Sequence, residues 1–218
     1  MSLYIDIHTH GVTQVPEDVL ALSSVLIKGV PAADSVGFYS AGIHPWDAFR
    51  AQESWLDIFD LQDRNLIAIG EIGLDYRKEY EPYDVQLKWF VKQVRMAENI
   101  GIPIVIHNVR AQGEILKVLK NRDLSWIIHG FTGSIESAMM FVNAGGYISF
   151  GEGLFHSDRT AEALRMAPPE CIFLETDESK MPITAIYSKA AKITGIREEK
   201  LRDHIEKNFR KVFTRATV

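Results

Sequence analysis

Short apolar runs recur along the whole chain, and most of them alternate with stretches that have the periodicity of an α-helix. The runs are apolar at nearly every position, which is typical of parallel strands covered on both faces. We expect eight strands, at residues 3–8, 20–27, 37–43, 66–69, 102–106, 126–128, 147–150 and 172–175. We expect helices at residues 53–61, 83–99, 112–120, 135–143, 160–165, 184–193 and 198–213.

This alternation predicts an α/β fold of the (β/α)8 TIM-barrel type. Few residues separate the first two expected strands, so we expect a barrel that lacks its first helix and is trimmed in its first unit. The chain has 218 residues, of which 46% are hydrophobic. That length and composition suit one domain, residues 1–218, around one core.

The cysteine count and the apolar runs bear on the compartment. Cys171 is the only cysteine, so the chain cannot form an internal disulfide. The N-terminus does not read as a secretory signal, and no apolar run approaches the roughly 20 residues of a membrane span. We therefore expect a cytoplasmic protein with no membrane association and no obligate protein partner.

The formal net charge of −5 argues against a surface built for non-specific nucleic-acid binding. A nucleic-acid substrate stays compatible with this charge, because two cations in a carboxylate-rich cleft can hold a phosphodiester locally.

Metal-binding residue types follow the expected strands. Side chains alternate between the two faces of a strand, so His8 and His10 leave the first strand on the same side and could hold one cation. The further candidates are His44, Glu71, His107, His129 and Asp177. The carboxyl ends of the strands of a (β/α) barrel meet on the face that carries the active site.

Each of these residues also has a structural interpretation, since a lone histidine at a strand end is more often a hydrogen-bonding group than a ligand. Glu71 could cap a turn, and Asp177 could be the N-cap of a short helix. Six such residues at the ends of five strands are hard to explain by chance: His8, His10, Glu71, His107, His129 and Asp177.

The number of candidate ligands favours two ions. One catalytic zinc needs three protein ligands and an open position, which four imidazoles and two carboxylates exceed. We expect two divalent ions that share the Glu71 carboxylate. Mixed nitrogen and oxygen ligands suit Zn, Mn, Fe or Mg.

Six segments together carry a resemblance to a known family. They are Ile5-Asp6-Ile7-His8-Thr9-His10, Gly42-Ile43-His44-Pro45-Trp46, Gly70-Glu71-Ile72-Gly73-Leu74-Asp75-Tyr76, Pro103-Ile104-Val105-Ile106-His107, His129-Gly130-Phe131-Thr132-Gly133-Ser134 and Leu174-Glu175-Thr176-Asp177. In this order they resemble the TatD family of metal-dependent deoxyribonucleases, within the amidohydrolase superfamily.

The resemblance implies a two-metal centre that hydrolyses phosphodiester bonds in DNA, often from the 3′ end. It implies that His8, His10, Glu71 and Asp177 hold one ion, and that Glu71, His107 and His129 hold the other. Asp177 would also act as the general base, and His44 and Arg110 would hold the substrate phosphate.

The chain departs from the family pattern at two places. It has His107-Asn108-Val109-Arg110 where the family usually has His-Ser-Arg, and Glu178-Ser179-Lys180-Met181-Pro182 where the family has a basic, arginine-containing loop. Two other functions therefore stay open. One is hydrolysis at carbon, of an amide, a lactone or an aminoacyl-tRNA ester, and the other is metal or phosphate binding without catalysis.

Overall fold

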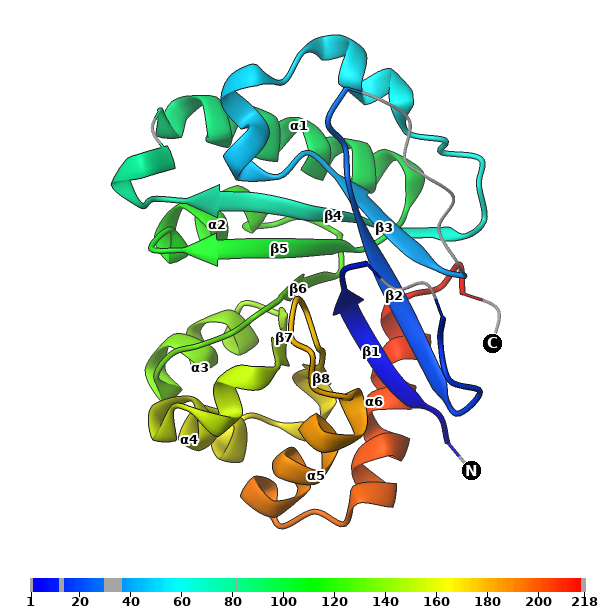
Figure 1. The fold of residues 1–218 in the computed structure, drawn as a ribbon. Coiled ribbons are helices and arrows are strands. Elements are labelled where there is room, and N and C mark those ends of the chain that lie inside the picture. The colour runs from blue at the N-terminus through cyan, green and yellow to red at the C-terminus, as the bar shows by residue number, and fades with distance from the viewer. Residues whose placement is uncertain (1, 12–13, 30–36, 81, 217–218) are drawn as a thin grey trace. The chain divides into compact units, whose positions relative to one another are not determined.

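The computed structural model describes residues 2–11, 14–29, 37–80 and 82–216. Its strands belong to one sheet and are hydrogen-bonded in chain order (Figure 1). They are β1 (Tyr4–Thr9), β2 (Val19–Leu26), β3 (Tyr39–Gly42), β4 (Leu66–Asp75), β5 (Ile104–Val109), β6 (Trp126–Ile128), β7 (Tyr147–Phe150) and β8 (Ile172–Leu174). The pairs β1–β2, β3–β4, β4–β5, β6–β7 and β7–β8 are parallel, as the continuous apolar runs predict.

The chain divides into two compact units, with one boundary inside strand β2, one inside strand β6 and one between Val212 and Phe213. The first unit comprises residues 1–23 and 127–212, and the second comprises residues 24–126 and 213–218. The single domain expected over residues 1–218 stays a prediction.

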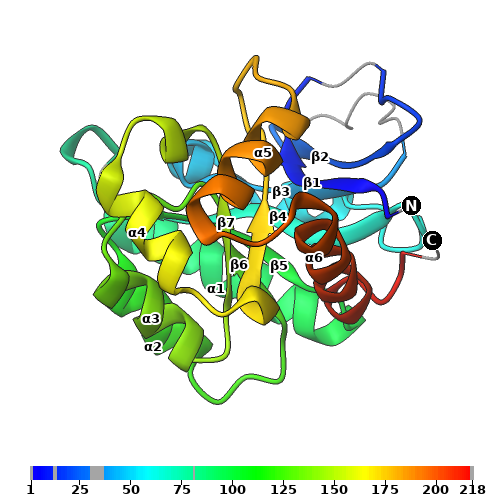
Figure 2. The same cartoon turned by 90° about the horizontal axis from the view of Figure 1, so that it is seen from below.

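The first unit contains β1, β7, β8 and most of β2 and β6, and its described residues also form helices. These are α3 (Ile135–Asn143), α4 (Asp158–Met166), α5 (Ile183–Thr194) and α6 (Glu198–Val212), with short 3-10 helices η4 (Glu152–Phe155) and η5 (Pro169–Cys171). Helix α4 packs against α3 and α5, and α6 packs against β1 and β8 (Figure 2). The described residues between β1 and β2 form bends and turns rather than a helix, which agrees with the expected trimming.

The second unit contains β3, β4, β5 and the last three residues of β2, with helices α1 (Tyr83–Ile100) and α2 (Gln112–Leu119). Helix α1 packs along β4 (Figure 1). Three short 3-10 helices complete the unit: η1 (Pro45–Arg50), η2 (Glu53–Ile58) and η3 (Lys78–Tyr80).

Two predictions in this unit were wrong. The helix expected at residues 53–61 is the shorter 3-10 helix η2, and none of its residues is buried, so little packing supports a longer helix. Strand β4 does not end at Ile69 but continues to Asp75, and all of its residues are buried. The glycines of this segment do not break the strand. At Gly73, whose φ is +146°, an added Cβ would lie 2.0 Å from the carbonyl oxygen of His107, so the glycine permits the close approach of β5.

In the first unit, side chains of the covering helices bond the backbone of the strands. The Tyr187 hydroxyl of α5 accepts a hydrogen bond from the Ile5 amide, 3.1 Å away, and donates one to the Ile5 carbonyl, 3.0 Å away. The Asn208 amide of α6 donates to the carbonyls of Pro169 and Ile172. Buried backbone groups need such partners, so these contacts fix the helices against the ends of β1 and β8.

In the second unit, two glutamines of α1 have the same role. The Gln93 side chain bonds both backbone groups of Ile43, and the Gln86 side chain bonds both backbone groups of Asp75. The two glutamines are seven residues apart and therefore lie on one face of the helix. Both are buried, so α1 fixes the ends of β3 and β4 by hydrogen bonds as well as by apolar packing.

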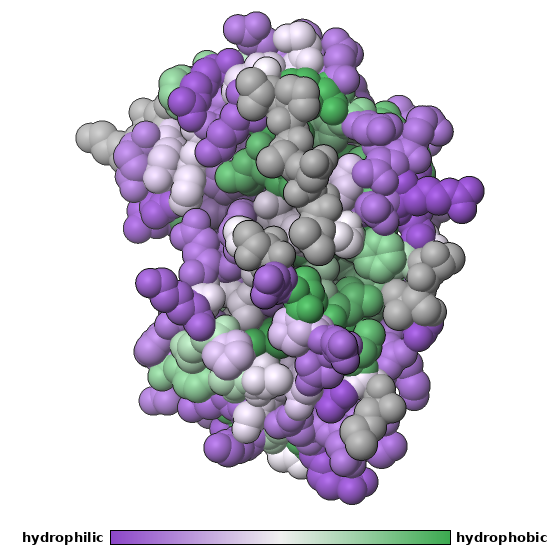
Figure 3. Space-filling model, turned by 45° about the vertical axis from the view of Figure 1, so that its right-hand side comes forward, coloured by the Kyte–Doolittle hydropathy of each residue, from purple (hydrophilic) through white to green (hydrophobic). Residues whose placement is uncertain are grey.

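The surface is largely hydrophilic on the face shown in Figure 3, where apolar side chains form smaller green patches. Among the helices that the described residues form, none is both long enough and apolar enough to cross a membrane.

Replacement of Tyr187 by phenylalanine should lower the free energy of unfolding by about 1–3 kcal/mol, because both backbone groups of Ile5 would lose a buried partner. Urea denaturation measures this. Tyr4→Phe is the matched control, since the Tyr4 hydroxyl bonds Glu198 at a half-exposed position where water can replace it. Equal losses in the two variants would contradict the assigned role of Tyr187.

Candidate functional site

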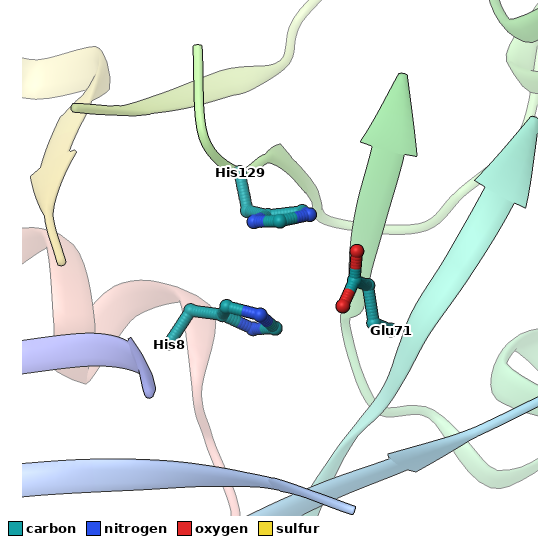
Figure 4. Close-up of side chains that lie close together, drawn as sticks. All are labelled: His8, Glu71 and His129. Carbon is teal, nitrogen blue, oxygen red and sulfur yellow. The ribbon is translucent and has the colours of Figure 1, made fainter. Parts of the chain in front are cut away.

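In the first unit, β1 brings His8 and His10 to one side, as the strand alternation predicts. His8 is fully buried, and the centres of the two rings are 4.9 Å apart. The ring of His129, which follows β6, lies beside the ring of His8, with 4.2 Å between their centres (Figure 4). Three imidazoles from two distant segments therefore gather within this unit.

Asp177 reaches this group because the chain beyond β8 pairs with β1. The Asp177 amide donates to the His8 carbonyl, and the His10 amide donates to the Asp177 carbonyl. Asp177 has a φ of 54°, a left-handed conformation that aspartate tolerates better than most residues. Its Oδ1 lies 3.7 Å from Nε2 of His8 and 3.5 Å from Nε2 of His10. His8, His10 and Asp177 thus offer ligand atoms within 4.8 Å of one another.

Glu175 belongs to the site but was not among the residues selected from the sequence. It is completely buried, and its Oε1 accepts a hydrogen bond from the Gly130 amide and lies 3.4 Å from Nδ1 of His129. Burial by itself would raise the pKa of Glu175, but the His129 and His8 imidazoles and the Ser149 hydroxyl together outweigh burial and lower it. The signal available in the sequence was its place in the Leu174-Glu175-Thr176-Asp177 segment. With His129 and Asp177, it forms a second group able to hold a metal ion.

Asp6 ties β1 to the segment that precedes Asp177. Its carboxylate accepts hydrogen bonds from the amide and the hydroxyl of Thr176. Burial raises the pKa of Asp6 to about 7, although the bonds from Thr176 act in the opposite direction. Asp6 therefore helps to set where Asp177 stands relative to His8.

In the second unit, His44, Glu71 and His107 form another such group. Glu71 leaves strand β4 (Figure 4). Its Oε1 lies 3.1 Å from Nε2 of His44 and 2.7 Å from Nδ1 of His107. Nδ1 of His44 accepts a hydrogen bond from the Trp46 amide, which places the proton of the neutral ring on Nε2. His44 is thus oriented to donate to Glu71.

Asp75 lies on the opposite side of the His107 ring from Glu71. Its Oδ2 lies 3.2 Å from Nε2 of His107, and the carboxylate also accepts from Arg77 and from the Trp46 indole. Burial would raise the pKa of Asp75, but the bonds from His107, Arg77 and Trp46 outweigh it and hold the pKa well below its usual value. Asp75 was not selected from the sequence, although it lies in the Gly70 to Tyr76 segment.

The structure places Arg110 at the end of β5, where it is exposed and has a φ of 56°. Of the ligands expected from the sequence, His8, His10, His129 and Asp177 lie in the first unit, and Glu71 and His107 lie in the second. The donors of both units are imidazole nitrogens and carboxylate oxygens, which fit Zn, Mn or Fe well.

Comparison with known proteins identifies the family. The sequence model of the TatD related DNase family matches residues 8–214, almost the whole chain. The chain belongs to the TatD family. The match includes each ligand candidate taken from the sequence, so the resemblance inferred from the six segments is confirmed.

Two relatives of the TatD family member described here carry informative names. An uncharacterized metal-dependent hydrolase of Bacillus subtilis, YabD, is 31% identical over 148 residues, which are 64% of this chain and 58% of the relative. The deoxyribonuclease Tat-D of Schizosaccharomyces pombe is 31% identical over 117 residues, 51% of this chain and 38% of the relative. The chain thus spans less than two thirds of the length of these relatives.

A solved structure supports the fold. YJJV, a TatD homologue from Escherichia coli, matches with a TM-score of 0.74 at 22% identity, covering 81% of this chain and 76% of that one. Together with the chain-order sheet, this likeness confirms the expected (β/α)8 TIM-type fold class.

Replacement of His8 by alanine should remove about one divalent ion per chain, because it deletes a buried donor of the group that also contains His10 and Asp177. Elemental analysis of the purified protein measures the loss. His156→Ala is the matched control, since His156 is exposed and its ring contacts Glu152. Unchanged stoichiometry in His8→Ala would refute its assignment as a ligand.

Proposed function

We propose that this TatD family protein is a metal-dependent phosphodiesterase that hydrolyses DNA, with 3′ to 5′ exonuclease action as the specific form. The observation that carries the proposal is the set of imidazole and carboxylate groups, His8-His10-Asp177 and His44-Glu71-His107, each compact enough to hold a cation. Family membership and the name of the fission yeast relative support DNA as the substrate.

The proposal assigns the residues as the family resemblance does. His8, His10, Glu71 and Asp177 would hold one ion, and Glu71, His107 and His129 would hold the other. When bound, two divalent ions would lower the pKa of a water molecule and offset the charge of the phosphate. Loading with Mn²⁺ tests the pairing, because two ions that share the Glu71 carboxylate give a spin-coupled signal and separate ions do not.

Asp177 is the proposed general base. Its carboxylate lies near two imidazoles, yet its side chain is 42% exposed. One oxygen can therefore bind a metal ion while the other contacts the attacking water molecule. A general base must come within hydrogen-bond reach of the proton it accepts, and this exposure permits that approach.

Substrate binding would draw on the second unit. His44 and Arg110 are the proposed phosphate contacts. Trp46 is 40% exposed and stacks on Tyr80, with 5.1 Å between the ring centres. We propose that its exposed ring stacks on a base of DNA. The Arg77 guanidinium lies over both rings and adds positive charge beside them.

Hydrolysis at carbon is the second candidate, and a pocket of the first unit favours it. The pocket has a volume of about 270 Å³, and its lining includes the carboxylates of Glu152, Asp177 and Glu178. The described residues that line it include no lysine or arginine. Where bound cations do not offset these charges, such a lining repels phosphate and accepts a neutral or cationic group.

One assay panel separates the candidates. Protein shown to contain metal is tested with bis(p-nitrophenyl) phosphate, with 3′-labelled single-stranded DNA and with p-nitroanilide amides, each with added Mg²⁺, Mn²⁺ or Zn²⁺. Release of 3′-terminal nucleotides supports the nuclease. Turnover of amides alone supports hydrolysis at carbon, and turnover of none supports a protein that binds metal without catalysis.

We also propose a reducing compartment such as the cytoplasm. Burial raises the pKa of the Cys171 thiol, which keeps it protonated and poorly reactive.

Asp177→Asn should retain most of the bound metal and lose about 10²–10⁴-fold in rate, because the amide can still offer an oxygen but cannot accept the proton of the attacking water. Elemental analysis and the DNA assay measure the two quantities in the same preparation. A rate within a few-fold of the parent would remove Asp177 from the role of base.

A further inference from the structure

The Asp75 carboxylate collects donors from three residues. It is fully buried at the end of β4, and its oxygens lie 2.7 Å from Nε1 of Trp46, 2.6 Å from Nη2 of Arg77 and 3.2 Å from Nε2 of His107. Two of these residues, Trp46 and the Arg77 beside it, belong to the surface proposed to stack on a DNA base, and the third is a proposed metal ligand. One carboxylate thus touches both parts of the proposed machinery.

The position of Asp75 is itself fixed by α1. The Gln86 side chain accepts a hydrogen bond from the Asp75 amide, 2.7 Å away, and donates to the Asp75 carbonyl, 3.0 Å away. Gln86 also donates to the Tyr80 carbonyl, and Tyr80 stacks on Trp46. The carboxylate therefore has little freedom to follow a movement of the His107 ring.

The two nitrogens of His107 face different carboxylates. Nε2 faces Asp75, and Nδ1 faces Glu71 at 2.7 Å. An ionised carboxylate only accepts hydrogen bonds, so the contact with Asp75 keeps a proton on Nε2. The 2.7 Å contact between Nδ1 and Glu71 needs a proton while no cation is bound, and a cation that replaces this proton meets the Nδ1 lone pair on the side of Glu71.

We propose that Asp75 is a positioning residue, which holds the Nε2 proton of His107 so that Nδ1 faces Glu71 as a metal ligand, and which fixes Trp46 and Arg77 beside that ligand. The ligand role of His107 rests on the proposed function. Carboxylates that orient metal-bound imidazoles in this way commonly contribute about 10–100-fold to metal affinity.

The test is Asp75→Asn. An asparagine presents either its oxygen or its NH2 group to Nε2. It has one accepting oxygen, whereas the carboxylate has two with which to accept hydrogen bonds from Trp46, Arg77 and His107. We expect Mn²⁺ affinity, measured by isothermal titration calorimetry, to fall by about 10–100-fold. We also expect the ¹⁵N shifts of the His107 ring in metal-free protein to report less protonation of Nε2.

Asp63→Asn is the matched control. Asp63 lies in the same unit and accepts hydrogen bonds from the Tyr39 hydroxyl and the Asn65 amide, both 2.8 Å away, next to the amino-terminal ends of β3 and β4. It should leave both the Mn²⁺ affinity and the His107 shifts as in the parent. A general loss of stability would affect both variants, whereas a positioning role affects only Asp75→Asn.

The outcomes are distinguishable. Asp75→Asn with parent-like His107 shifts and an Mn²⁺ affinity within threefold of the parent would overturn the inference. A parent that takes up no divalent ion would overturn the proposed function, while the ring shifts would still decide the Asp75–His107 contact. If Asp75→Asn does not fold, the parent alone decides that contact: His107 without a hydrogen-bonded Nε2 proton would refute it.

Discussion

The hydrogen-bonding demand of the buried backbone at the strand ends is the constraint on which the site depends. A parallel strand that ends early, or that diverges from its neighbour, leaves amide and carbonyl groups that must find partners away from water. In both units these partners are side chains of covering helices. Tyr187 is hydrogen-bonded to the backbone of Ile5, Gln93 to that of Ile43 and Gln86 to that of Asp75. Each contact lies within three residues of a candidate site residue, so the helix packing also sets the positions of the ligands.

A second constraint is the charge of the buried carboxylates. Glu175 and Asp75 are both removed from water, yet the pKa of each is lowered, because imidazoles and, for Asp75, a guanidinium and an indole compensate for the lost hydration. Burial of a charge is costly unless it is paired and hydrogen-bonded. The carboxylates and histidines therefore depend on one another, and a single substitution among them is expected to disturb its neighbours.

The sequence predicted most elements closely, for identifiable reasons. Strands β6 and β7 and helix α3 have the predicted bounds, since each has a clear apolar pattern between turn residues. The segment after Ile69 misled the prediction because glycines usually interrupt a strand. Here Gly73 instead permits the approach of β5, a contact between segments more than thirty residues apart that no local pattern reveals. The helix expected at residues 53–61 failed for the related reason that periodicity does not measure burial.

Residue order alone was enough to predict the fold class and most of the donor atoms, because strand and helix periods are local properties and show which histidines and acids follow strands. The packing of the chain was needed to find which donors meet within a unit, that Glu175 contacts His129, and that Asp75 lies behind His107. It also assigned Gln86 and Gln93 to the strand ends. These contacts join residues distant in the chain, and their hydrogen bonds depend on positions correct to a few tenths of an ångström, which only the packing of helix against sheet sets.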